Sequence, residues 1–235
     1  MTARTDGGGV ERARVVVVEG IDGAGKSTVC RVMADRLSGV HHLTNKSLCE
    51  DPPWAKRMMR DLANIIWPTN DTDFDHLLPA AFWLHLQAAW YGLLTEFVIT
   101  PRLATGGTLL IDGWYYKLVA KLILRGFVLR QLEDAFAHAA QPDQVVLLAP
   151  DPAAVWNRPR AFRLTELGLH HPEEYPDLGR DSFIQYQNRI AAELHGLAVR
   201  KDWKIIPIEP HATPTETADA VIRVLEGHLD VQHFS

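Results

Sequence analysis

Short apolar runs recur along the chain, and polar or glycine-containing segments separate them. The first run, Val15–Val18, has four β-branched residues in a row, which is typical of a central parallel strand buried on both faces. Four later runs predict further strands: Val40–Asn45, Thr108–Ile111, Val145–Leu148 and Trp203–Ile208. Helical patterns lie between them. The chain is therefore expected to form an α/β fold with five parallel strands and helices on both faces.

The helical patterns differ in how much apolar surface they present. They cover Lys26–Leu37, Asp51–Trp67, His76–Thr100, Tyr115–Leu124, Leu132–Ala139, Pro150–Asn157, Asp181–Val199 and Thr215–Leu229. The helix expected at His76–Thr100 is apolar on most faces, so it should lie at the centre of the domain or be covered by a partner. Thr69–Asp75 is expected to be a polar turn.

Two further segments lack strand or helix patterns. Residues 1–13 are polar and glycine-rich and predict a flexible tail, which leaves residues 14–235 as a single domain. Residues 158–180 are basic at first and then acidic, and they contain two glycines and three prolines. This composition is typical of a mobile loop, so we expect a lid at about 158–180.

Composition narrows the class of protein. The chain has 235 residues, of which 47% are hydrophobic, which is enough for one domain with a sizeable core. The net charge of -5 does not favour a nucleic-acid binder. No run approaches the roughly 18 apolar residues that span a bilayer, so a membrane is not an expected partner. Cys30 and Cys49 lack metal-site spacing and favour a reducing cytoplasm.

The segment Gly20–Ser27, GIDGAGKS, directly follows the first predicted strand and opens a helix. It fits the pattern of a phosphate-binding loop, the P-loop. Glycines let the backbone wrap around phosphate oxygens, the lysine reaches the β and γ phosphates, and the serine hydroxyl ligates Mg²⁺. The sequence therefore predicts a nucleotide site with ATP and Mg²⁺, built by Gly20, Gly23, Ala24, Gly25, Lys26, Ser27 and Thr28.

Asp112 ends the third predicted strand. Ligands bind at the carboxyl ends of parallel strands, so its carboxylate could hold Mg²⁺ together with Ser27 or accept a proton. The alternative is a solvated turn residue before Gly113. Arg158, Arg160 and Arg163 fall at the start of the expected lid, where closing arginines could stabilise a transferring phosphoryl group. Alternatively, the three arginines form a solvated basic run with no role in catalysis. Their spacing in the sequence does not decide which of them would contact the phosphoryl group.

Val15–Val29, VVVVEGIDGAGKSTV, resembles the start of thymidylate kinases. The similarity continues in order: Leu110-Ile111-Asp112 stands where the family's D-R-[YFW] motif begins, and Pro142-Asp143 resembles the approach to its fourth strand. It extends over most of residues 14–230. The resemblance implies a nucleoside monophosphate kinase fold, ATP, Mg²⁺, often a homodimer, and a role for Asp22 in contacting the acceptor sugar. It also implies a branch of the family in which the lid supplies the arginines.

The departures from the family pattern concern the acceptor. The family carries R-E-P-G-G-T after the second strand, where this chain has Thr44–Leu48, and Gly113 replaces the arginine of D-R-[YFW]. Counting back from Asp112 places Tyr91 near a family arginine that engages thymidylate. Bidentate arginine contacts to phosphate are not replaced by glycine or tyrosine, although Lys46 could compensate in part.

Aromatic residues are frequent around these positions, and such rings can stack on bases, although any one of them could simply be core. The predicted acceptor contacts are Asp22, Lys46, Tyr91, Trp114 and Tyr115. The predicted catalytic residues are Asp22, Lys26, Asp112, Arg158, Arg160 and Arg163. The sequence thus indicates an ATP-dependent kinase with a non-standard acceptor: a modified nucleotide, a nucleoside or a small hydroxylated metabolite. A dTMP kinase with altered contacts, or a non-catalytic nucleotide-binding switch, are the alternatives.

Overall fold

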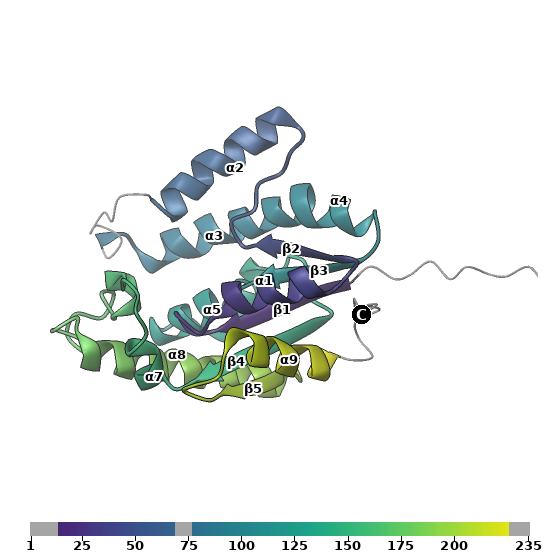
Figure 1. Ribbon diagram of the computed structural model, residues 1–235. Helices are drawn as coiled ribbons and strands as arrows, with labels where there is room; N and C mark the ends of the chain where they lie inside the picture. The colour runs from purple at the N-terminus through teal and green to yellow at the C-terminus, as the bar shows by residue number, and fades with distance from the viewer. Residues whose placement is uncertain (1–13, 69–76, 226–235) are drawn as a thin grey trace, which may run out of the picture.

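A five-stranded parallel sheet runs through the middle of the molecule in the computed structural model, which describes residues 14–68 and 77–225 (Figure 1). The strand order is β2-β3-β1-β4-β5. The strands are β1 Arg14–Gly20, β2 Val40–Thr44, β3 Thr108–Asp112, β4 Gln144–Pro150 and β5 Lys204–Ile208. β1 is central: Val18 pairs with Asp112 on one side and Val146 on the other. The predicted α/β class and parallel sheet are confirmed.

Helices cover both faces of this sheet (Figure 1). Their bounds are α1 Lys26–Arg36, α2 Pro53–Ile66, α3 Ala80–Leu94, α4 Thr100–Leu103, α5 Tyr116–Leu124, α6 Leu129–Ala135, α7 Pro152–Trp156, α8 Arg180–Arg200 and α9 Pro214–Leu225. α1 and α9 pack against one face, whereas α5 and α8 pack against the other. The buried valines of β1 lie between these layers, with Val16, Val17 and Val18 at 0% exposure.

The helix expected at His76–Thr100 differs from the prediction. It begins at Ala80, passes through a π-helical turn, η2, at Thr95–Ile99, and continues as α4 to Leu103. Pro101 has no N–H to donate and would crowd a regular helix, and the wider turn ends two residues before it, at Ile99. The Thr95 hydroxyl donates to the Tyr91 carbonyl (2.8 Å) and accepts from the Ala140 N–H (2.8 Å), which ties this turn to the rest of the fold.

The helix predicted at Leu132–Ala139 begins three residues earlier and ends four residues earlier, at Leu129–Ala135. Val128 is extended and precedes the first turn, and the Gln131 side-chain oxygen accepts the Val128 N–H (3.4 Å). This local capping sets the start, whereas hydrophobic periodicity alone placed it too late.

The expected lid, at about 158–180, contains one short 3₁₀ turn, η3, at Leu164–Glu166, and its last residue, Arg180, is the first residue of α8. The segment is attached to the helices beside it by aromatic packing: the Phe162 ring stacks on Trp156 (4.3 Å) and meets Phe183 edge-on (4.9 Å). Its mobility stays a prediction.

Several earlier expectations concern parts that lie outside the described residues: the tail at 1–13, the turn at Thr69–Asp75 and the end of the last helix at Leu229. The single-domain expectation for 14–235 stays a prediction. Among the described helices, none is long and apolar enough to cross a bilayer.

Candidate active site

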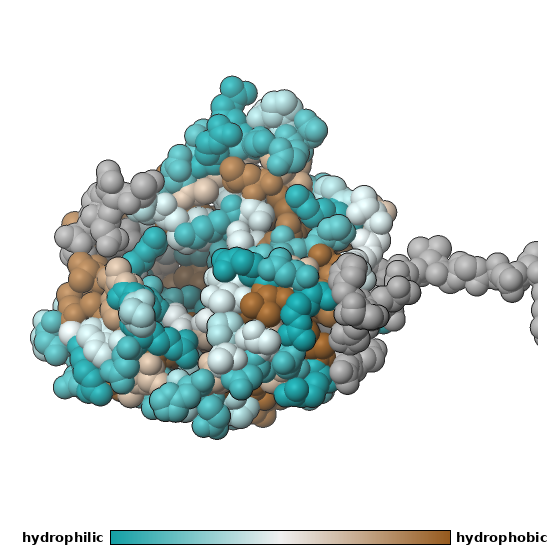
Figure 2. Space-filling model, in the orientation of Figure 1, coloured by the Kyte–Doolittle hydropathy of each residue, from teal (hydrophilic) through white to brown (hydrophobic). Residues whose placement is uncertain are grey.

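A cavity of about 480 Å³ opens at the carboxyl ends of the central strands. It joins the expected P-loop to a second, partly aromatic half. The lining residues are Glu19, Asp22, Gly23, Lys26, Ser27, Asn45, Lys46, Ile66, Trp67, Trp83, Gln87, Tyr91, Asp112, Gly113, Trp114, Lys117, Leu118, Lys121, Leu122, Arg125, Arg163, Thr165, Glu166 and His170. The face drawn in Figure 2 is hollowed near its centre, with hydrophilic residues along much of the rim.

The loop Gly20–Ser27 has the backbone that a phosphate cradle requires. Gly20, Gly23 and Gly25 all have positive φ angles, of 156°, 78° and 96°. A Cβ at Gly20 would lie 2.7 Å from the Leu148 carbonyl oxygen, and one at Gly23 would overlap the Arg160 guanidinium. Glycine is therefore needed at both positions, because a side chain would strain the backbone and collide with these neighbours.

Lys26 begins α1 and folds back over this loop. Its Nζ donates to the carbonyls of Gly20 (3.0 Å) and Ile21 (2.9 Å). Burial, followed by the positive charge of Lys117, lowers the pKa of Lys26 to about 8. An anion bound in the cradle would raise the pKa of Lys26 again, because its negative charge favours the protonated ammonium group. The position and the charge of Lys26 therefore fit a phosphate ligand.

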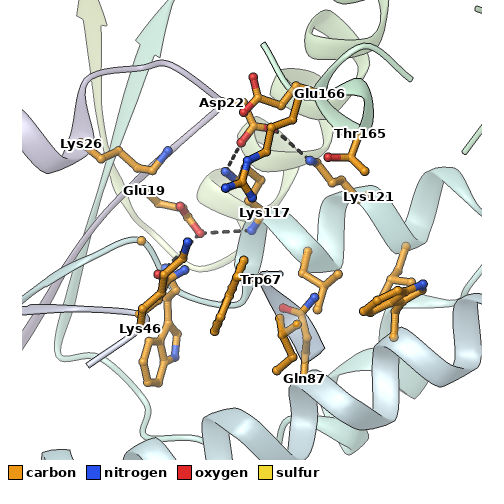
Figure 3. Close-up of a pocket in the computed structure, with 18 of the residues that line it drawn as sticks. Glu19, Asp22, Lys26, Lys46, Trp67, Gln87, Lys117, Lys121, Thr165 and Glu166 are labelled. Carbon is orange, nitrogen blue, oxygen red and sulfur yellow. Dashed lines mark hydrogen bonds and ion pairs between the residues drawn. The ribbon is translucent and has the colours of Figure 1, made fainter. Parts of the chain in front are cut away.

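Asp22 lies at the centre of a cluster of charged and polar side chains (Figure 3). Lys117 and Lys121, one turn apart on α5, form ion pairs with its two carboxylate oxygens, the second at 2.9 Å. Burial alone would raise the pKa of Asp22, but the charges of Lys117, Lys121 and Lys26 hold it well below its usual range. The carboxylate is therefore ionised at neutral pH.

Gln187 on α8 connects this cluster to the lid. Its side-chain oxygen accepts the Asp22 N–H (3.2 Å), and its Nε2 donates to the Asp22 carboxylate (3.4 Å) and the Glu166 carbonyl (2.9 Å). The side chain is fully buried. Three segments that are distant in sequence, the P-loop, α8 and the lid, are thereby fixed to one another.

Glu19 is a fully buried carboxylate at the end of β1. It accepts the backbone N–H groups of Gly20 (3.1 Å), Trp114 (3.4 Å) and Lys117 (3.1 Å). Lys117 lies in the first turn of α5 and Trp114 lies just before its N-cap, so Glu19 supplies the carboxylate that this helix N-terminus lacks from its own residues. Burial raises its pKa, although Lys26 and Lys117 act in the opposite direction.

The three predicted lid arginines occupy different positions. Arg158 donates to the Gly23 carbonyl (2.8 Å), and Arg160 forms an ion pair with Glu166. Arg163 lines the cavity itself. The structure thus brings all three to the P-loop or its cavity, and Arg163 is the one of them that lines the cavity.

Ser27 and Asp112, the expected magnesium ligands, both line this cavity. Hydroxyl and carboxylate oxygens are the ligands that Mg²⁺ prefers, and this ion usually keeps several waters and phosphate oxygens as its remaining ligands. Within the described part of the chain, no group of three or more His, Cys, Asp or Glu side chains could hold a metal ion unaided. The donor set fits a metal that arrives with a nucleotide.

The predicted acceptor residues are only partly brought together. Lys46 lies over the Trp67 ring (5.0 Å), and Tyr91 packs edge-on against Trp114 (4.8 Å), all on the cavity wall. Tyr115 is elsewhere: its ring stacks on Phe136 (4.4 Å) and its hydroxyl accepts from the Gln141 amide (3.3 Å). We therefore withdraw Tyr115 as an acceptor contact.

Sequence reasoning missed Glu19, Gln87, Lys117, Lys121 and Gln187. A signal for the two lysines was present, because positions four apart share a helix face and this helix follows the strand that ends at Asp112. Gln187 gives no local signal, since its partner Asp22 is 165 positions away.

A strand, a glycine-rich cradle, a helix and an arginine-bearing lid together define a P-loop kinase. No family model matches the chain. It is 30% identical over 162 residues to a thymidylate kinase of Xylella fastidiosa, covering 65% of this chain and 72% of that protein. A thymidylate kinase of Rhodopseudomonas palustris is 26% identical over 221 residues, covering 93% and 90%. The chain belongs to the thymidylate kinase family.

Solved structures share the fold. A thymidylate kinase from Candida albicans superimposes with a TM-score of 0.64 at 16% identity, covering 95% of this chain and 99% of its own. One from Ehrlichia chaffeensis gives a TM-score of 0.61 at 14% identity, with 91% and 98% covered. The protein is a phosphotransferase of thymidylate-kinase type.

Proposed function

We propose that this protein transfers the γ-phosphoryl group of ATP, with Mg²⁺, to an acceptor other than ordinary dTMP. The observation that carries the proposal is a cavity that joins an intact P-loop to a rebuilt acceptor half. In the transfer, an acceptor oxygen forms a bond to the γ phosphorus, the bond from phosphorus to the β–γ bridging oxygen breaks, and ADP leaves.

The donor half contains each part that this chemistry needs. Lys26 and the loop amides would hold the phosphates, and Ser27 and Asp112 would ligate Mg²⁺, which supplies charge neutralisation at the phosphate oxygens. Arg163 would face the transferring group. Catalysis would come mainly from positioning and from charges that are already in place.

The acceptor half supports a non-standard acceptor. Gly113, Tyr91 and Asn45 line it at or near places where the resemblance leads us to expect arginines, and Gly113 has a φ of 73° with no side chain to contact a ligand. Tyr91 is 2% exposed and its phenol is held neutral, because burial raises its pKa. None of the three could form a bidentate ion pair with a phosphate.

Phosphorylation of dTMP itself is the second candidate. The relatives that show the family are thymidylate kinases, and one is matched over 90% of its length. Cationic side chains still surround the cavity, and they could hold a monophosphate in another way. The two candidates differ in one measurable quantity, the kcat/KM for dTMP relative to other acceptors.

A panel of acceptors with ATP and Mg²⁺ tests the proposal. It should contain dTMP, other pyrimidine nucleotides with modified bases, nucleosides and small amino alcohols, with transfer followed by labelled γ-phosphate. We expect an acceptor whose kcat/KM exceeds that for dTMP by about tenfold or more. If dTMP is the best acceptor at a rate usual for its family, the second candidate replaces the first.

The affinity for ATP·Mg²⁺ is expected to fall about tenfold per pH unit as the pH rises above 8. In the free protein Lys26 loses its proton near pH 8, and a bound triphosphate would have to restore it. Calorimetry in buffers of different ionisation enthalpy should detect proton uptake on binding at pH 9. The Lys26→Arg variant stays charged, so it should show neither effect; a flat profile for the wild type would contradict the prediction.

Assembly and location stay predictions. We propose a homodimer, and the large exposed apolar side chains Trp54, Met58 and Ile65 on α2 and Phe82 on α3 support it, because such a surface is commonly covered by a partner. We also propose a cytoplasmic protein, which both cysteines in their reduced form support.

A further inference from the structure

Gln187 on α8 is a buried glutamine with hydrogen-bond partners at both ends of its amide. Its oxygen accepts the Asp22 N–H (3.2 Å), and its Nε2 donates to the Asp22 carboxylate (3.4 Å) and the Glu166 carbonyl (2.9 Å). The Asp22 N–H can only donate and the other two groups can only accept, so the partners fix the orientation of the amide. Moving this side chain would leave several polar groups unpaired inside the fold.

These contacts join the P-loop to the lid behind the wall of the cavity. Gln187 has 0% exposure and is not one of the residues that line the cavity, whereas Asp22 and Glu166 both line it. The side chains of these two residues lie close together in Figure 3. Gln187 therefore has no direct access to a ligand, and it can influence one only through the positions of Asp22 and Glu166.

The lid meets the same loop at a second point. The Arg160 guanidinium lies against Gly23 and forms an ion pair with the Glu166 carboxylate. Glu166 thus has two roles, because its side chain holds Arg160 while its carbonyl accepts from Gln187. The P-loop and the lid are connected in a closed ring of contacts, so a ligand that fixes one part of the ring also restricts the other part.

Two carboxylates are brought together where the loop and the lid meet. Asp22 is ionised, and burial, followed by the charge of Asp22, raises the pKa of Glu166. Like charges at low exposure repel, and this repulsion acts to separate the lid from the loop. The amide of Gln187 donates to both residues, so its hydrogen bonds oppose the separation.

We propose that Gln187 is a positioning residue that couples the lid to the P-loop, so that the donor and the acceptor bind with positive cooperativity. The inference rests on the proposed transfer from ATP to an acceptor held in this cavity. A triphosphate in the cradle orders the loop and attracts the lid arginines, and Gln187 transmits this order to Asp22. The acceptor then meets a site whose ordering is already complete, so it binds more tightly.

The test measures how much a bound donor strengthens acceptor binding in the full chain. Calorimetry gives the dissociation constants of dTMP and of the best acceptor of the panel, each without and with a non-hydrolysable ATP analogue and Mg²⁺. We expect the analogue to tighten acceptor binding about tenfold in the wild type and less than about twofold in Gln187→Met. Methionine keeps the length of the side chain and removes all three hydrogen bonds. The affinity for the analogue alone should change less than about threefold.

A second variant separates lost coupling from a loosened core. Gln187→Glu keeps an oxygen for the Asp22 N–H, but when ionised it repels the Asp22 carboxylate and donates to nothing. Burial beside Asp22 raises the pKa of the introduced carboxyl, and protonation returns one donor. The coupling in Gln187→Glu should therefore increase as the pH falls from about 9 to about 6. Gln187→Met, measured at the same pH values, shows the contribution of other titrating groups and should not recover.

Gln185→Met is the matched control, because it makes the same change on the same helix at an exposed position. It should keep the wild-type coupling, and melting temperatures should follow the fold of every variant. Three results would overturn the inference: a wild type without coupling, a Gln187→Met variant with wild-type coupling, or a Gln187→Glu variant whose coupling does not respond to pH. Failure of the proposed function looks different. If dTMP is the best acceptor, the proposed acceptor preference fails, while the coupling and its loss in Gln187→Met remain.

Discussion

Replacing Lys26 with methionine is expected to lower kcat/KM for phosphoryl transfer by about 10²- to 10³-fold, the loss usually seen when one donor to a developing charge is removed. Methionine keeps most of the apolar stem and removes only the ammonium group. In the free protein that group donates to the Gly20 and Ile21 carbonyls, so it is already inside the phosphate cradle. Steady-state kinetics with the best acceptor of the panel would measure the loss.

The same substitution should not unfold the protein, which distinguishes lost catalysis from lost structure. Burial and Lys117 lower the pKa of Lys26 to about 8, so its charge opposes folding at neutral pH. The melting temperature of Lys26→Met should therefore equal or exceed that of the wild type. Lys201→Met, the same change at an exposed ion pair, should keep full activity. A Lys26→Met enzyme with more than about a tenth of wild-type kcat/KM would contradict the role of Lys26.

The strands and the donor loop could be predicted because their signals are local. The four consecutive valines Val15–Val18 predict a buried strand from their residue type alone. The eight consecutive residues Gly20–Ser27 contain every residue type that the phosphate cradle needs. The helix starts were less accurate: the side-chain contact from Gln131 that fixes α6 is invisible to hydrophobic periodicity.

The acceptor half could be predicted only in part, because tertiary contacts build it. Trp114 and Tyr115 are neighbours in sequence, yet one lines the cavity and the other packs on Phe136. Successive side chains just before α5 point in different directions, so the exact residue at which α5 starts decides which of the two aromatic rings lines the cavity. Glu19 fixes that start through N–H groups 95 and 98 positions away, a distance over which no local pattern extends.

Removing the Glu19 side chain is the change with the largest expected effect on stability. Glu19→Ala leaves the N–H groups of Gly20, Trp114 and Lys117 without this acceptor inside the fold, and we expect a loss of about 2–4 kcal/mol in the free energy of unfolding. Urea denaturation would measure it. Glu133→Ala, at an ion pair with 48% exposure, is the control and should change the value by less than about 1 kcal/mol.

Glu19→Gln isolates the charge from the hydrogen bonds, because glutamine keeps one acceptor oxygen in nearly the same shape. Burial raises the pKa of Glu19 above its ordinary 4.5, so the folded state holds this proton more tightly than the unfolded chain does. The wild type should therefore lose stability relative to Glu19→Gln as the pH rises above about 4.5 through the raised pKa. Urea midpoints for both proteins between pH 4.5 and pH 8 would show this gap widening; a gap that narrows would mean that Lys26, Lys117 and the backbone donors stabilise the carboxylate more than burial opposes it.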